Sequence, residues 1–183
     1  MKKIAFITGM TGQDGPYLAK HLLENDYKVY GLVKRYSNPN LSNLDYLGIQ
    51  DDVELITGDI TDDANMIHLI KTIRPNEFYN LAAQSFVGSS WEISKMTAEV
   101  NAMGVLNILN AIVGHNPITK FYQASTSELY GNANIDGVQN EKTPFRPCSP
   151  YGISKLYAYW MTVNFRESYS LHASNGILFN HES

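Results

Sequence analysis

The 183-residue chain has one cysteine, few charged residues and no long apolar run. Cys148 alone can form neither an internal disulfide nor a cysteine-rich zinc site, and the five histidines are scattered, so no metal site is expected. A net charge of -4 argues against a basic nucleic-acid-binding surface. No uninterrupted apolar stretch approaches the ~20 residues of a membrane span. The first apolar run ends at Gly9 without a signal-peptide cleavage pattern. These absences predict a cytoplasmic protein without nucleic-acid or membrane partners.

Short apolar runs alternate with helical patterns along the chain. Together with continuous apolar strands, this alternation predicts an α/β fold, a doubly wound, mostly parallel sheet of the Rossmann type, in one domain over residues 1–183. We expect a further domain to follow, because the sixth strand has no covering helix. The expected strands are 3–8, 28–33, 53–57, 77–82, 119–125 and 172–179; the expected helices are 13–25, 41–47, 63–73, 92–113 and 151–170, with a long loop over 131–150.

A glycine-rich turn connects the first predicted strand to the first predicted helix. Glycines let the backbone turn sharply and approach a phosphate, and the helix N-terminus adds unpaired N–H groups and a partial positive charge. In this position the spacing G-x-x-G-x-x-G predicts a pyrophosphate-binding turn of a dinucleotide site. A tight turn without a ligand is the alternative. The residues of the turn are Gly9, Met10, Thr11, Gly12, Gln13, Asp14 and Gly15.

The end of the second strand indicates which dinucleotide binds. An NAD site usually has a carboxylate there, about 20 residues after the glycine turn, for the ribose hydroxyls. This chain has no carboxylate at that point but has Lys34, Arg35 and Ser37. The planar guanidinium of Arg35 suits a 2′-phosphate. The sequence therefore predicts NADP, unless Lys34 and Arg35 are only solvated loop charges.

Two further strand ends are expected to contact the dinucleotide. Asp59 and Ile60 follow the third strand, where the carboxylate could accept a hydrogen bond from an adenine amine. Mostly small residues follow the fourth strand and would permit close approach of the cofactor. Either segment alone could be only a helix cap or a loop. The residues after the fourth strand are Leu81, Ala82, Ala83, Gln84 and Ser85.

Acid–base residues occur at the end of the fifth strand and at the start of the last helix. Tyr151 and Lys155 are four residues apart and therefore share a helix face. The lysine ammonium and an oxidised nicotinamide would favour the Tyr151 phenolate, so that this tyrosine could act as a base near neutral pH. Thr126 could bind the substrate oxygen, and Glu128 could abstract a proton beside a newly formed carbonyl. The bland alternatives are a surface Tyr–Lys pair and a loop carboxylate.

At these residues the sequence resembles the extended short-chain dehydrogenase/reductase superfamily and, within it, the GDP-mannose 4,6-dehydratase family. The resemblance extends from Ile7 to Ser183. It implies a sugar-nucleotide lyase with NADP as cofactor and GDP-mannose as substrate, a dimer or tetramer, and a C-terminal substrate domain that this chain lacks. The matching segments are ITGMTGQDGPYLAKHLLE, YNLAAQSFVGSSW, FYQASTSELYG, SPYGISKLYAYWMTVNFRE and GILFNHES.

The resemblance also implies roles for individual residues. Tyr151, with Lys155 and Thr126, would remove the C4 hydroxyl proton of the sugar, and Glu128 would take the C5 proton and help water leave from C6. Ser85 would contact substrate or nicotinamide. Asn180 would contact substrate and His181 the cofactor.

Two other readings remain. A sugar-nucleotide reductase or epimerase has the same fold but does not need a carboxylate directly after the Thr-Ser pair. A non-catalytic dinucleotide-binding module would not need Thr126, Glu128, Tyr151 and Lys155 together.

Overall fold

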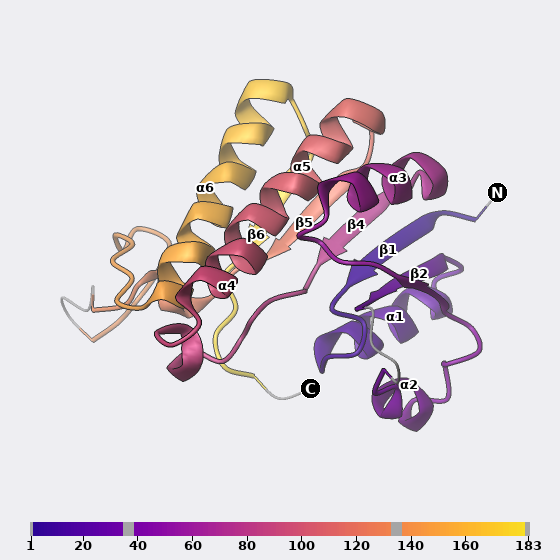
Figure 1. The fold of residues 1–183 in the computed structure, drawn as a ribbon, viewed down its shortest axis with the longest axis horizontal. Coiled ribbons are helices and arrows are strands. Elements are labelled where there is room, and N and C mark those ends of the chain that lie inside the picture. The colour runs from indigo at the N-terminus through magenta and orange to yellow at the C-terminus, as the bar shows by residue number, and fades with distance from the viewer. Residues whose placement is uncertain (1, 35–38, 133–136, 182–183) are drawn as a thin grey trace.

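Six parallel strands form the centre of the molecule (Figure 1). The computed structural model describes residues 2–34, 39–132 and 137–181. The strand order is β3-β2-β1-β4-β5-β6, and every neighbouring pair is parallel. This order confirms the predicted doubly wound sheet, since the chain runs outward from β1 in both directions. The strands are β1 (Ile4–Thr8), β2 (Lys28–Val33), β3 (Glu54–Thr57), β4 (Glu77–Asn80), β5 (Lys120–Ala124) and β6 (Ala173–Gly176).

Helices cover both faces of the sheet. One apolar cluster joins the sheet to α3, α5 and α6, and a second joins it to α1 and α2. Figure 1 shows α3, α5 and α6 side by side on one face, with α1 and α2 on the other side of the sheet. The helices are α1 (Asp14–Glu24), α2 (Ser42–Tyr46), α3 (Asp63–Ile73), α4 (Ser94–Ala98), α5 (Gly104–His115) and α6 (Pro150–Tyr169).

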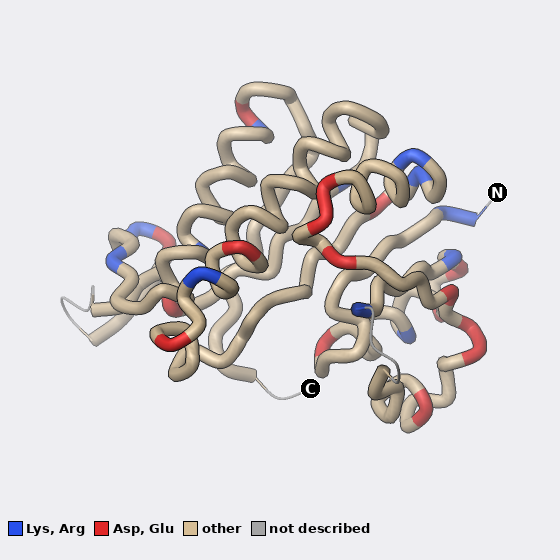
Figure 2. Tube along the Cα trace, viewed as in Figure 1, with Lys and Arg blue, Asp and Glu red and all other residues tan. Residues whose placement is uncertain are grey.

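The predicted helix 92–113 is three elements in succession. A π-helical turn, Glu99–Met103, separates α4 from α5. The stretch Ser94–His115 is long and apolar enough to cross a membrane by length and composition alone, although it contains charged residues near its start. Of its apolar 18-residue window, 56% is buried within the domain. α5 has no Lys, Arg, Asp or Glu (Figure 2) and packs between α3 and α6. The packing is that of a core helix.

The sequence analysis missed two short 3₁₀ helices. They are Gly88–Ser90 after β4 and Ser127–Leu129 after β5. Ser127–Leu129 follows β5 closely and contains Glu128, and Ser89 of the other 3₁₀ helix accepts a hydrogen bond from the Gln84 side chain.

Candidate functional site

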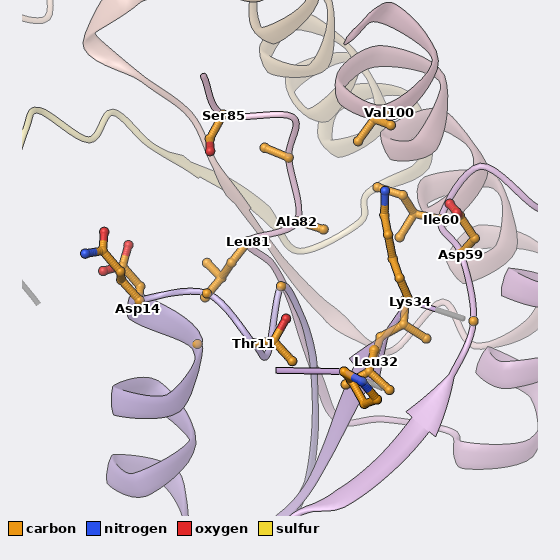
Figure 3. A pocket seen from close by; sticks show the side chains of 18 of the residues that line it. Thr11, Asp14, Leu32, Lys34, Asp59, Ile60, Leu81, Ala82, Ser85 and Val100 are labelled. Atoms are coloured by element: carbon orange, nitrogen blue, oxygen red, sulfur yellow. The ribbon is translucent and has the colours of Figure 1, made fainter. Parts of the chain in front are cut away.

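A cavity of about 680 Å³ lies at the carboxyl ends of β1, β2, β3 and β4 (Figure 3). Six of the seven residues of the glycine turn line it, Gly9, Thr11, Gly12, Gln13, Asp14 and Gly15, whereas Met10 is buried in the core. The turn therefore occupies the position that a parallel sheet of this order offers to a ligand.

Close backbone packing leaves no room for a side chain at two of the three glycines of the turn. Gly9 has a φ of 74°, and a Cβ there would lie 2.8 Å from the carbonyl carbon of Leu81. A Cβ on Gly15 would lie 2.6 Å from the carbonyl oxygen of Gly9. At Gly12 the same contact is 3.2 Å. Gly9 and Gly15 are therefore needed for the fold, whereas packing constrains Gly12 less.

The N-terminus of α1 is open toward the cavity. Gln13, at the N-cap, makes no side-chain capping hydrogen bond. The first N–H groups of a helix have no partner within the helix, and with the helix dipole they form an anion site. Asn43 of α2 donates to the Gly12 carbonyl at 2.8 Å and so braces the turn.

An ion pair joins this turn to the segment after β6. Nε2 of His181 lies 3.1 Å from both carboxylate oxygens of Asp14, and Nδ1 lies 2.8 Å from the carbonyl oxygen of Phe179. Since both ring nitrogens face acceptors, the contacts favour the doubly protonated imidazolium. The Phe179 carbonyl and then Asp14 raise the pKa of His181. The structure thus places His181 at the turn, while the neighbouring Asn180 is exposed.

The second and third strands provide the opposite wall. Lys34 follows β2, and its side chain extends along the cavity (Figure 3). Arg35 and Ser37 lie outside the described residues. Asp59 and Ile60, predicted to contact a dinucleotide, line the cavity. The Oδ1 atom of Asp59 accepts hydrogen bonds from the backbone N–H and hydroxyl of Thr61 at 2.9 and 2.8 Å.

Only part of the segment after β4 faces the cavity. Leu81, Ala82, Ala83 and Ser85 line the cavity, but Gln84 does not. The Gln84 side chain donates to the carbonyl of Phe86 and the hydroxyl of Ser89, both at 3.0 Å. Its backbone N–H and carbonyl are held by the Asn101 side chain at 2.8 and 3.0 Å. Gln84, predicted to bind cofactor, instead shapes this segment.

Sequence reasoning missed the contribution of the π-helical turn. Val100 lines the cavity opposite the glycine turn (Figure 3), and Asn101 holds Gln84. An inserted helical turn depends on packing that a sequence pattern does not display, although π turns often accompany functional sites.

The four acid–base residues come together at the end of β5 and the start of α6. The Ser149 hydroxyl caps α6 by accepting a hydrogen bond from the Gly152 N–H at 3.0 Å, so the first turn of the helix presents Tyr151. Tyr151 and Thr126 are each 8% exposed and Lys155 is 3% exposed. The Thr126 hydroxyl accepts from the Glu128 N–H at 3.2 Å, which fixes the start of the 3₁₀ helix that presents Glu128.

Burial shifts the pKa values of both Tyr151 and Lys155. Burial raises the pKa of the Tyr151 phenol, the Thr126 hydroxyl lowers it in part, and Glu128 raises it further. Burial lowers the pKa of Lys155 to about 8. The lysine Nζ donates to the Ala124 carbonyl at 2.9 Å and lies 5.9 Å from the centre of the Tyr151 ring. Burial and Glu128 thus favour the neutral phenol, so the phenolate expected from the sequence would depend on the oxidised nicotinamide as well as on Lys155.

The two parts of the candidate site share the carboxyl edge of the sheet but not one enclosed space. Thr126, Glu128, Tyr151 and Lys155 are absent from the lining of the cavity, whose boundary on that side includes Ser85. Among the described residues, no three His, Cys, Asp or Glu side chains gather as metal ligands.

The strand order, the glycine turn and the Tyr–Lys helix define a Rossmann-fold domain of the short-chain dehydrogenase/reductase class. The sequence model of the GDP-mannose 4,6 dehydratase family matches residues 6–183. The chain therefore belongs to the GDP-mannose 4,6-dehydratase family.

Comparisons with individual proteins agree with this assignment. The chain is 54% identical to GDP-mannose 4,6-dehydratase of Yersinia enterocolitica, over 100% of the chain and 50% of that protein. A UDP-glucose 4-epimerase from Thermotoga maritima has a TM-score of 0.81 at 27% identity, covering 92% of the chain and 52% of the epimerase. A dTDP-glucose 4,6-dehydratase from Bacillus anthracis, in complex with NAD, has a TM-score of 0.79 at 26% identity, covering 94% and 53%. The chain spans about half the length of these relatives.

Proposed function

We propose that the full-length protein is a GDP-mannose 4,6-dehydratase, which converts GDP-D-mannose to GDP-4-keto-6-deoxy-D-mannose and water. Family membership supports this reaction. The observation that carries it is the presence of Glu128 beside Thr126 and close enough to Tyr151 to shift its pKa. Alcohol oxidation needs the tyrosine alone, whereas elimination of water needs a second acid–base group.

The cavity suits a dinucleotide, and we infer that it is NADP. The open N-terminus of α1 and Gly12 fit a diphosphate. Apolar Ile60 and Val100 fit a base, and Lys34 adds a positive charge where an NAD site would have a carboxylate. When bound, NADP would supply the hydride acceptor for C4 of the sugar and the hydride donor for C6.

Each catalytic side chain then has a defined role. Tyr151 takes the proton of the C4 hydroxyl, and the Thr126 hydroxyl binds the same oxygen. The resulting 4-ketone acidifies C5. The Glu128 carboxylate takes the C5 proton. The carboxylic acid that results then protonates the C6 hydroxyl, which leaves as water. Lys155 is assigned as the cation that favours the Tyr151 phenolate when the oxidised nicotinamide is bound. Burial and Glu128 act in the opposite direction.

Three further residues contact the ligands in this proposal. Ser85 lies at the boundary between the cavity and the acid–base residues, and so suits contact with the nicotinamide or the sugar. Asn180 and His181 follow β6, with His181 anchored at the phosphate turn. We assign Asn180 to the substrate and His181 to the cofactor diphosphate.

The experiment is to incubate the full-length protein with GDP-mannose and NADP and to follow the 4-keto product by its absorbance in alkali. We expect product from the unmodified protein, none from Tyr151→Phe, and none from Glu128→Gln. An epimerase or reductase would give a different sugar and would tolerate Glu128→Gln. A non-catalytic binding module would bind NADP but leave GDP-mannose unchanged.

We also propose that the protein associates with further copies through the outer face of α4 and α6. Ile153, Tyr157 and Trp160 are exposed and recur at the i, i+4 and i+7 positions of α6. Met96 of α4 and Met103 of the π-helical turn are each 46% exposed, and both elements pack against α6. Trp160→Glu should shift the full-length protein toward monomer in light scattering; an unchanged mass would refute this surface.

A further inference from the structure

Three polar side chains are buried in the middle of the sheet, directly beneath the site. Thr8 and Asn80 are 0% exposed and Gln123 is 1% exposed. They are register partners on neighbouring strands: Thr8 faces Asn80, and Asn80 faces Gln123. They therefore form a single polar row across β1, β4 and β5.

The row of residues two positions earlier on the same strands is entirely apolar. Phe6, Phe78 and Phe121 are register partners, with ring centroids 5.0 and 6.0 Å apart. Because side chains alternate along a strand, both rows face the same helices. Burial of a polar group costs free energy unless it is hydrogen-bonded, and an apolar row would serve packing as well. The change from phenyl rings to one hydroxyl and two amides at the carboxyl edge therefore indicates that the polar groups have a function at that edge.

Hydrogen bonds join the polar row into a chain that ends at the catalytic helix. The Ala82 N–H donates to the Thr8 hydroxyl at 3.1 Å, and that hydroxyl donates to the Asn80 Oδ1 atom. The Asn80 Nδ2 group donates to the Gln123 Oε1 atom at 2.8 Å. The Gln123 Nε2 group donates to the Ala124 carbonyl at 2.8 Å.

Lys155 completes the chain. Its Nζ group donates to the same Ala124 carbonyl at 2.9 Å, so one oxygen receives both Gln123 and the lysine. The next strand adds a second connection to α6: Asn175, the register partner of Gln123, donates to the Tyr159 carbonyl at 3.2 Å. Lys155 and Tyr159 are one helical turn apart, and Tyr151 lies one turn before Lys155.

We infer that Thr8, Asn80 and Gln123 form a positioning network that holds the Ala124 carbonyl toward Lys155 and thereby places the lysine beside Tyr151. None of the three lines the cavity or is among the four acid–base residues. They act only through the Ala124 carbonyl and Lys155. The catalytic consequence rests on the proposed function, whereas the placement of Lys155 does not.

The test compares isosteric variants of the full-length protein. Gln123→Met and Thr8→Val each remove one donor of the chain, and Thr8→Ser keeps the hydroxyl. Thr162→Val is the matched control, because Thr162 is also buried on α6 but donates only to the Ala158 carbonyl of its own helix. Equilibrium unfolding of each variant shows how much stability is lost.

The direct readout is trace acetylation of Lys155, followed by mass spectrometry across the lysine titration range without GDP-mannose. Gln123→Met loses the hydrogen bond from Gln123 to the Ala124 carbonyl. This loss should raise the limiting rate of Lys155 acetylation at high pH about tenfold. Thr8→Val should raise it less, and Thr8→Ser and Thr162→Val should match the unmodified protein. Acetylation of Gln123→Met no faster than that of Thr162→Val would overturn the inference.

Kinetics provide the second readout. Gln123→Met and Thr8→Val should lower kcat for dehydration with an unchanged KM for GDP-mannose, and Thr8→Ser should restore kcat. Equal losses in Thr162→Val would show a stability effect and overturn the inference. If the unmodified protein dehydrates nothing while the acetylation rates differ as expected, the positioning network stands and the proposed function fails.

Discussion

At the scale of single residues, the three glycines of the turn have different roles. The sequence assigns all of them to a ligand, but Gly9 and Gly15 already have backbone atoms where a Cβ would be placed. The distinction depends on contacts between Leu81 and Gly9 and between Gly9 and Gly15. A sequence pattern cannot display such contacts.

Substitution of these glycines should separate folding from binding. Gly15→Ala should lower the free energy of unfolding by about 1–3 kcal/mol, because its Cβ overlaps the Gly9 carbonyl. Gly12→Ala should have a free energy of unfolding near that of the unmodified protein but bind NADP more weakly. Denaturant titration and fluorescence titration with NADP measure the two effects. A Gly12→Ala variant with unimpaired binding would contradict a diphosphate at this turn.

The pair of His181 and Asp14 predicts a pH dependence. The pKa of His181 in the folded state is raised above the usual 6.5. The stability from its contact with Asp14 should therefore be fully present below pH 6.5 and be lost as the pH rises through the folded-state pKa of His181. The Tyr122 phenol also faces Asp14, and burial and then Asp14 raise its pKa. In an NMR titration, Asp14→Asn should lower the pKa of His181. An identical titration curve in Asp14→Asn would exclude the ion pair.

Lys34 allows the choice of dinucleotide to be tested at a described residue. If a 2′-phosphate lies at the end of β2, Lys34→Ala should weaken NADP binding several-fold more than NAD binding, since only NADP carries the extra charge. Arg35→Ala should act in the same direction. Isothermal titration with both dinucleotides measures the difference, and equal losses would remove the assignment of NADP.

At the scale of secondary structure, the start of α6 determines where Tyr151 lies. Ser149→Ala removes the cap on Gly152 and should lower the free energy of unfolding by about 1 kcal/mol, whereas Ser149→Asp should retain most of it. Denaturant titration of both variants provides the check. Equal stability of the alanine and aspartate variants would show that the cap contributes nothing.

The helices and strands were largely predictable because their signals are local. The expected strand 28–33 and helix 63–73 match β2 and α3, and the Asp62 carboxylate caps α3 by accepting from the Asn65 N–H. The helix expected over 92–113 exists, but its π turn was not foreseen. Local periodicity shows that a helix forms, whereas tertiary packing decides where it is interrupted.

The candidate site was predictable in its residue types but not in its connections. Most residues singled out at the first, third and fourth strand ends do line the cavity, because parallel strands bring their carboxyl ends to one edge. Gln84 departs from this pattern because Asn101, far along the chain, holds it. The buried row of Thr8, Asn80 and Gln123 went unnoticed, since each looks ordinary within its own strand.

At the scale of the whole molecule, the described residues provide a dinucleotide cavity and an acid–base cluster at one edge of one sheet. The cavity has a boundary at Ser85 and does not enclose Tyr151. We therefore expect the half of the relatives' length that this chain does not cover to complete the sugar-nucleotide site. The 183 residues alone should bind NADP but form little or no 4-keto product.

The most direct test uses full-length protein with GDP-mannose carrying deuterium at C4 of the sugar. If Tyr151 and Glu128 act on one substrate with a hydride that is stored and returned, NMR of the product should show the deuterium at C6, with no net reduction of NADP. Deuterium retained at C4, or accumulating in reduced NADP, would contradict the account.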